Sequence, residues 1–108
     1  MRLPDDVIVE RNKLVNYLLV HRPADDKSGF LRAAGFVRSN PDRLDAAIRE
    51  LALTAESYED GENEYGVFWR TEGVLRGPLA DVQVVLIWLN CFAAGSFRFV
   101  TLKPKRSD

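Results

Sequence analysis

Several side chains have the chemistry that metal-independent cleavage of RNA requires: a group that moves a proton, and cations that stabilise the phosphorane. His21 is the only histidine, and histidine is the side chain whose charge changes near neutral pH. Lys27 and Arg98 are candidate cations for the phosphate, and Thr101 or Tyr65 could donate a hydrogen bond to it. Such residues are also common on solvated surfaces, so the pattern defines catalytic and substrate-binding candidates and leaves the solvated alternative open.

Cys91 is the single cysteine, which excludes an internal disulfide and a multi-cysteine zinc site. A thiol nucleophile paired with His21 would need a third, orienting group, and none is identifiable. A small apolar filler is therefore the expected role of the thiol. The sequence also lacks a P-loop, a dinucleotide-binding glycine fingerprint, a Gly-x-Ser-x-Gly elbow and a His-Glu-x-x-His motif. We expect no cofactor and no metal site.

The strongest local charge is an acidic cluster formed by Glu56, Glu59, Asp60, Glu62 and Glu64. Residues 54–80 contain six acidic and two basic residues, although the net charge of the whole chain is only −1. The spacing does not match an EF-hand calcium loop, and a glycosidase pair has no further support. A solvated hairpin tip is the expected role, and an acidic patch that docks a basic partner is the alternative.

The aromatic residues of the second half are expected to belong mainly to the core, although they could also stack nucleic-acid bases. They are Trp69, Trp88, Phe97 and Phe99. Phe92 differs, because it lies in the apolar loop Cys91–Gly95, and loops usually run over the surface. Phe92 therefore either folds back over the core or marks a contact site for a partner.

Helical periodicity with capping signals fills the first half of the chain. The first predicted helix is Arg11–Val20, with apolar residues at helical spacing. A second helix over about 26–34 should end at Gly35, since glycine suits the left-handed position after a helix. The third begins at Pro41 with Asn40 as its N-cap, and its apolar residues follow the pattern of one buried face.

The second half changes to segments rich in β-branched and aromatic residues, separated by glycine-containing turns such as Asp60-Gly61. The predicted strands are Leu53–Tyr58, Tyr65–Leu75, Val82–Asn90 and Phe97–Lys103. The third of these is apolar on both faces, which is typical of a central strand. Short connections favour an antiparallel meander. The predicted fold is α+β, with about three N-terminal helices packed on one face of a four-stranded antiparallel sheet.

Length and composition are those of a single globular domain, residues 1–108, with 46% hydrophobic and 29% charged residues. A dedicated duplex-binding protein would be more basic than this chain. The first residues lack the apolar core of a signal peptide, and the longest apolar run, Val84–Leu89, is too short to cross a membrane. We expect a soluble cytoplasmic protein that makes no membrane contact.

Short motifs in order along the chain resemble a family of small, uncharacterised bacterial and archaeal domains of unknown function. The motifs are Lys13-Leu14 with Tyr17-Leu18-Leu19, His21 with Lys27, Phe30-Leu31 running to Gly35-Phe36, Tyr65-Gly66, Gly77-Pro78, Trp88, and Arg98-Phe99-Val100-Thr101. The family pattern is roughly K-L-x-x-Y-L-L, H-P-x-G-R-x-K-A-R-F-F-x-x-x-G-F, Y-G, G-P, a strand with Val and Trp, and R-L-V-T. The resemblance covers nearly the whole chain.

The resemblance implies a context similar to toxin–antitoxin or polymorphic-toxin systems, because members look like small proteins encoded beside a second small protein. It also implies a layout similar to RelE-like and barnase-like ribonucleases, although a fold does not establish an activity. The chain departs from the family pattern at Ala24–Gly29, where Lys27 remains but two arginines are lost and acids stand nearby. It departs again at Cys91–Gly95, which is apolar where the family loop is polar.

Three interpretations follow. The first is a protein-interaction module that works with a small partner protein in a toxin–antitoxin-like pair, or that forms a homodimer, with Phe92 as the partner-binding residue. The second is a metal-independent ribonuclease that gathers His21, Lys27, Arg98 and Thr101, with Tyr65 binding the RNA. The third is a degenerate member that keeps the fold without the chemistry. Whether the chain is an enzyme stays open, and the two departures from the pattern favour the interaction module.

Overall fold

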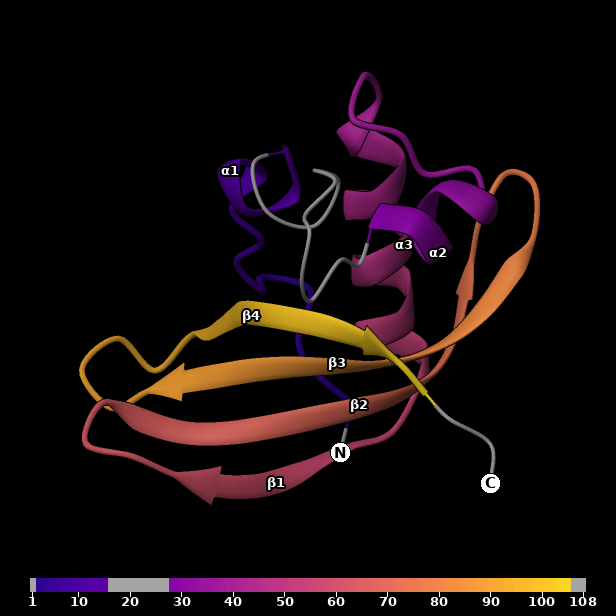
Figure 1. Ribbon diagram of the computed structural model, residues 1–108. Coiled ribbons are helices and arrows are strands. Elements are labelled where there is room, and N and C mark those ends of the chain that lie inside the picture. The colour runs from indigo at the N-terminus through magenta and orange to yellow at the C-terminus, as the bar shows by residue number, and fades with distance from the viewer. Residues whose placement is uncertain (1, 16–27, 106–108) are drawn as a thin grey trace.

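The computed structural model describes residues 2–15 and 28–105. Within these ranges the helices precede the strands (Figure 1). The elements are α1 (Arg11–Lys13), α2 (Ser28–Ala33), α3 (Pro41–Thr54), β1 (Ser57–Glu62), β2 (Gly66–Arg76), β3 (Asp81–Cys91) and β4 (Phe97–Pro104). This order confirms the α+β class.

The four strands form one antiparallel sheet in the order β1-β2-β3-β4, which is the predicted meander. β2 and β3 pair over their whole length, from Gly66 opposite Cys91 to Arg76 opposite Asp81. β3 lies between β2 and β4, as its two apolar faces predict. Val84 on one face of β3 and Val85 on the other are both buried.

α3 is the helix that packs broadly against the sheet. Its apolar positions recur every three or four residues, so they lie on one side of the helix, and that side faces the strands. Pro41 occupies the first helical turn as predicted, but the Asn40 side chain makes no capping hydrogen bond. The other described helical segments are short, three residues in α1 and six in α2, so a layer of three helices on one face of the sheet stays a prediction.

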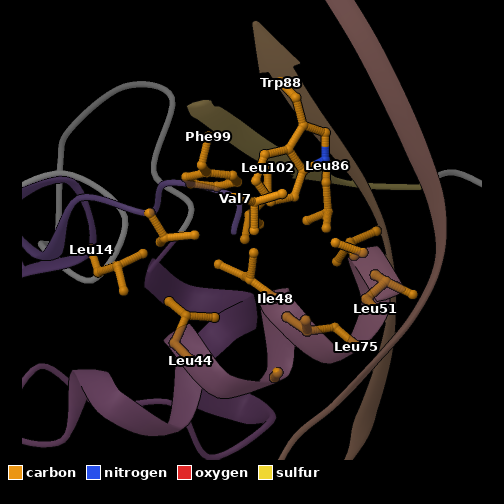
Figure 2. Packing of buried hydrophobic residues seen from close by; sticks show 14 of the residues in the cluster. Val7, Leu14, Leu44, Ile48, Leu51, Leu75, Leu86, Trp88, Phe99 and Leu102 are labelled. Carbon is orange, nitrogen blue, oxygen red and sulfur yellow. The ribbon is translucent and has the colours of Figure 1, made fainter. Parts of the chain in front are cut away.

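The core lies between α3 and the sheet (Figure 2). Ile48 is fully buried and points toward the side chains of β3 and β4. Trp88 and Phe99 meet edge to face there, with ring centroids 5.5 Å apart. The Trp88 indole also donates a hydrogen bond of 3.1 Å to the buried Thr71 hydroxyl, so its polar atom is satisfied inside the core. The predicted core role of Trp88 and Phe99 is therefore confirmed.

The N-terminal segment extends the sheet by one bridge beside β4. Ile8 donates a backbone hydrogen bond to Phe97 and accepts one from Phe99, each 2.8 Å long. The contact is parallel, and the neighbouring Val7 and Val9 are buried. The first part of the β4 edge is therefore closed by the chain itself. No helix in residues 2–15 and 28–105 is long and apolar enough to cross a membrane.

The predicted boundaries differ from the structure at two places. The helix predicted over Arg11–Val20 is described only in its first part, where α1 passes into a wider helical turn at residues 14–15. The strand predicted from Leu53 was wrong at its start, because α3 continues to Thr54 and is closed by a hydrogen bond from Ala55 to Leu51. Leu53 and Thr54 are exposed on the last helical turn, so their strand-like composition was misleading.

A third difference concerns the first hairpin. Asp60-Gly61 was predicted as its turn, but both residues lie inside β1, where the pairing with β2 shifts between Glu59 and Glu62. Gly61 has φ 96°, a left-handed conformation that glycine adopts without steric cost. The Asp-Gly signal therefore marks a bulge, and the turn itself follows at residues 63–65. Gly35, in contrast, has the predicted left-handed conformation, with φ 101°.

Candidate functional site

Two of the predicted contact residues, Tyr65 and Phe92, lie side by side at one end of the sheet. The β1–β2 and β3–β4 turns share this end, while the β2–β3 turn lies at the other end (Figure 1). The backbone N–H of Phe92 donates a hydrogen bond of 2.9 Å to the carbonyl of Tyr65. Tyr65 is 66% exposed and Phe92 is 60% exposed. We call this pair of neighbouring turns the aromatic tip.

The backbone of the aromatic tip is held by short-range hydrogen bonds. The Asn63 side-chain oxygen accepts from the N–H groups of Tyr65 at 2.8 Å and Gly66 at 3.1 Å. Asn63 in turn donates its backbone N–H to the Gly66 carbonyl at 2.9 Å. Gly66 lies so close to β3 that an added Cβ would come within 2.2 Å of the Asn90 carbonyl oxygen. The two turns are therefore fixed relative to each other before any partner arrives.

Acidic side chains precede the aromatic tip along the first hairpin. Glu59, Asp60, Glu62 and Glu64 are all exposed. Asp60 forms an ion pair with Arg70 at 3.6 Å, and the carboxylates of the other three make no ion pair within residues 2–15 and 28–105. The tip thus combines exposed aromatic area with negative charge.

Arg98 and Thr101, two of the catalytic candidates, both lie on β4. Arg98 stands opposite Leu89 and Thr101 stands opposite Ile87, so both belong to the sheet face turned away from α3. The Arg98 guanidinium is engaged by the Glu10 carboxylate. His21 and Lys27, the other catalytic candidates, lie outside the described residues. Their convergence with Arg98 and Thr101 therefore stays a prediction.

The same sheet face carries a hollow of about 330 Å³ over β2, β3 and β4. Glu72, Val85 and Lys103 stand directly opposite one another across the three strands. Arg70 and Lys105 border this row, and the buried Val85 forms its floor. We call the hollow with these residues the sheet-face hollow.

Glu72, which borders the sheet-face hollow, is hydrogen-bonded to Tyr58 on the neighbouring strand. The Tyr58 hydroxyl donates a hydrogen bond of 2.5 Å to Glu72 Oε2. This bond holds the pKa of Glu72 below its usual value of 4.5, against a smaller upward effect of desolvation, and Lys105 and Arg70 add to the lowering. The same bond raises the pKa of Tyr58 above 10.0. Glu72 is therefore an ionised acceptor at neutral pH.

Arg70 is held by charge but has no hydrogen bond to an acceptor among the described residues. Its guanidinium nitrogens lie 3.6 Å from Asp60 Oδ2 and 3.9 Å from Glu72 Oε1, which are ion-pair separations too long for hydrogen bonds. Its Nε is buried and has no hydrogen-bond partner in the described structure. A buried donor without a partner is uncommon in folded proteins, so this side chain is a candidate ligand-binding group.

The sequence contained a signal for the sheet-face hollow that the search for catalytic motifs missed. Arg70 and Glu72 are two positions apart in a predicted strand, which places them on one face, and Lys105 follows two positions after Lys103, the last residue of another predicted strand. What the sequence could not supply was the register between β2, β3 and β4. Only that register brings the two pairs to one hollow.

Other positions provide weaker sites. Two hollows of about 250 and 270 Å³ lie between α3 and β2 and share Ala47, Glu50 and Arg76. Cys91 is a half-buried free thiol. Among residues 2–15 and 28–105, no three histidine, cysteine, aspartate or glutamate side chains gather as metal ligands would.

Comparison with known protein families gives a match that covers nearly the whole chain. Residues 2–106 match the family described as Domain of unknown function (DUF6883). No curated protein matches the chain. The expectation of an uncharacterised family of this kind is confirmed, and the matched range includes the aromatic tip and the sheet-face hollow. The chain therefore belongs to the DUF6883 family, a domain of unknown function.

Proposed function

We propose that the protein is an interaction module that docks a small basic partner protein through the aromatic tip. The observation that carries this proposal is the backbone hydrogen bond from Phe92 to the Tyr65 carbonyl, which joins the two turns that carry these exposed aromatic residues. Aromatic residues are enriched at protein interfaces and at their energetic hot spots. A surface with two such residues on fixed turns loses little conformational freedom when it binds.

The charge around the aromatic tip selects the kind of partner. Glu59, Glu62 and Glu64 give this end of the sheet negative charge, so a partner with lysine or arginine beside apolar side chains complements it. A second copy of the chain meeting it tip to tip would bring like charges together, which disfavours a homodimer through this surface. The proposed partner therefore differs from the chain itself. A toxin–antitoxin-like pair is the biological setting we propose for it.

Peptide selection tests this docking surface. A displayed library of random peptides is selected on the wild-type chain, and the enriched sequences are synthesised and measured by fluorescence anisotropy. We expect enriched peptides to combine lysine or arginine with aromatic or aliphatic residues, and their Kd to rise about tenfold or more in Tyr65→Ala and Phe92→Ala. Leu79→Ala is the matched control, because Leu79 is 78% exposed in the turn at the opposite end of the sheet.

Two results would contradict the proposal. One is a set of enriched peptides that bind Phe92→Ala as tightly as the wild-type chain. The other is a wild-type protein that runs as a dimer in light scattering and becomes a monomer on the Phe92→Ala substitution, since that result assigns the tip to a second copy.

The metal-independent ribonuclease is the second candidate, and one observation favours it. Arg98 and Thr101 share a sheet face with the cationic Arg70 and Lys103, where an RNA backbone would find several positive charges. If this candidate is right, the chain cleaves RNA in the presence of EDTA. His21→Ala should abolish the cleavage and leave the far-ultraviolet circular dichroism spectrum unchanged. Cleavage that persists in His21→Ala would remove the catalytic assignment. A degenerate member would show the fold and no cleavage.

A further inference from the structure

The sheet-face hollow presents three cations that the described fold leaves without close hydrogen-bond acceptors. Lys103 and Lys105 form no ion pair within residues 2–15 and 28–105, and Arg70 is more than 3.5 Å from both of its acidic neighbours. All three side chains border the same hollow of about 330 Å³. Cations gathered in this way attract a multiply charged anion, and phosphate accepts hydrogen bonds from arginine and lysine together.

Glu72 adds a second requirement at the same place. One of its carboxylate oxygens, Oε2, accepts the Tyr58 hydroxyl, while the other lies 3.9 Å from the Arg70 guanidinium and receives no hydrogen bond among the described residues. An ionised carboxylate repels phosphate but accepts strongly from a hydroxyl group. A ligand that fits the whole hollow therefore carries a phosphate and, beside it, a hydroxyl that can donate.

A ribose phosphate has this combination of groups. We propose that the sheet-face hollow binds a phosphorylated ribose, as a free ribonucleotide or as a unit of single-stranded RNA, with Arg70, Lys103 and Lys105 holding the phosphate and Glu72 accepting the ribose hydroxyl. The buried Val85 gives the hollow an apolar floor against which the sugar can pack. The proposal is independent of the aromatic tip, which belongs to the end of the sheet, and it requires no cleavage.

The chemistry predicts a preference for RNA over DNA. Deoxyribose lacks the 2′-hydroxyl, so a DNA strand would bring its phosphate to the cations and leave Glu72 as an uncompensated negative neighbour. Removing the carboxylate by Glu72→Ala should strengthen DNA binding and bring the ratio of RNA to DNA affinity close to one. A merely electrostatic surface would show no such change in ratio.

The experiment measures fluorescence anisotropy of a labelled single-stranded RNA of eight nucleotides and of the DNA with the same base order. We expect the wild-type affinity for RNA to fall about tenfold in Lys103→Ala/Lys105→Ala. Arg32→Ala/Arg43→Ala is the matched control, because it removes two exposed cations from α2 and α3 and changes the net charge equally. The control should bind as the wild-type chain does.

Salt dependence counts the phosphate contacts. Three cations on the phosphates of a single strand give a slope of about −2 in a plot of log affinity against log salt, and the double lysine variant should retain about −0.7. If adenosine 5′-monophosphate at millimolar concentration displaces the labelled RNA, the free nucleotide is a ligand of the hollow. If the RNA binds but the nucleotide does not displace it, the site is specific for the RNA chain. Both results support the shared chemistry.

Three outcomes would overturn the proposal. The first is a wild-type chain that binds neither the RNA nor the nucleotide in 50 mM salt. The second is an equal loss of affinity in the two double variants, and the third is equal affinity of the wild-type chain for RNA and DNA. Phe92→Ala separates this site from the docking surface, because it should leave RNA binding unchanged while it weakens peptide binding. Failure at one surface therefore does not imply failure at the other.

Discussion

Tyr58 and Glu72 link neighbouring strands through their side chains. Tyr58 stands opposite Arg70, and its hydroxyl reaches diagonally to Glu72 two positions further along β2. The hydrogen bond keeps Glu72 ionised and turns one carboxylate oxygen toward β1. Tyr58 is therefore a positioning residue for the sheet-face hollow, although it does not border the hollow itself.

Tyr58→Phe should remove this coupling with a defined pH dependence. Because the folded pKa of Glu72 lies below 4.5, the bond stabilises the fold at neutral pH and is lost as the pH falls through that folded pKa. Because the pKa of Tyr58 lies above 10.0, the same stabilisation disappears again as the pH rises through it. Urea midpoints of the two proteins should therefore differ at pH 7 and converge as the pH falls below the folded pKa of Glu72.

Carboxyl carbon chemical shifts give a direct measurement of the same effect. The Glu72 titration should move upward toward its ordinary pKa in Tyr58→Phe. Tyr65→Phe is the control, since the Tyr65 hydroxyl makes no hydrogen bond to a described residue, and the Glu72 titration should not change there. An unchanged titration in Tyr58→Phe would show that Tyr58 does not hold the carboxylate.

The type of a residue was enough to predict it as a candidate contact residue, but the sequence did not show which residues would lie beside it in the fold. Tyr65 and Phe92 could be selected from the sequence, because Tyr65 has a hydroxyl that could donate to a phosphate and Phe92 lies in an apolar loop. Their adjacency depends on two hairpins meeting at one end of a meander, a relation between residues far apart in the chain. The convergence of Arg70 with Lys103 depends on register in the same way.

At the scale of elements, the hydrophobic periodicity and the residue composition predicted whether a segment is a helix or a strand better than they predicted its first and last residues. The strands β2, β3 and β4 were predicted to within one residue at each end, because alternation and glycine turns mark them clearly. α3 and β1 were confused over Leu53–Thr54, where β-favouring side chains occupy an exposed helical turn. Backbone hydrogen bonding in the last turn of α3 decides that boundary, and side-chain propensity is too weak to override it.

The bulge in β1 has a consequence for the docking surface. β1 is an edge strand, and such edges can pair with other chains. The irregular pairing between Glu59 and Glu62, together with the charge of β1, makes this edge a poor template for another strand. Association through the aromatic tip is therefore favoured over addition of a strand to β1.

At the scale of the molecule, the two proposed surfaces have opposite charge. Exposed acidic residues lie along the first hairpin, and three cations that make no close hydrogen bond to a described acceptor border the sheet-face hollow. This separation is invisible in the net charge of −1. A basic protein and an anionic ribose phosphate are thus directed to different parts of one sheet.

At the scale of the molecule, the β2–β3 turn also makes a close contact with the helical side of the fold. At the β2–β3 turn, Leu79 and Ala80 donate backbone hydrogen bonds of 2.9 and 3.3 Å to the carbonyl of Ala34, just after α2. Gly77 lies so close that an added Cβ would come within 2.2 Å of the Ala34 oxygen and 2.7 Å of the Ala80 oxygen. Both obstacles are backbone atoms, so relief requires the turn and the end of α2 to separate.

Gly77→Ala should therefore loosen the sheet from the helical side and lower the free energy of unfolding by about 1–3 kcal/mol, as overpacking does. Gly29→Ala is the matched control, because no described residue lies within 4 Å of its added Cβ and alanine in α2 should raise stability by about 0.5–1 kcal/mol. Urea unfolding followed by tryptophan fluorescence, to which the buried Trp88 contributes, measures both changes. Equal midpoints for Gly77→Ala and the wild-type chain would show that the turn relaxes freely, and that the Ala34 contact does not hold the two layers together.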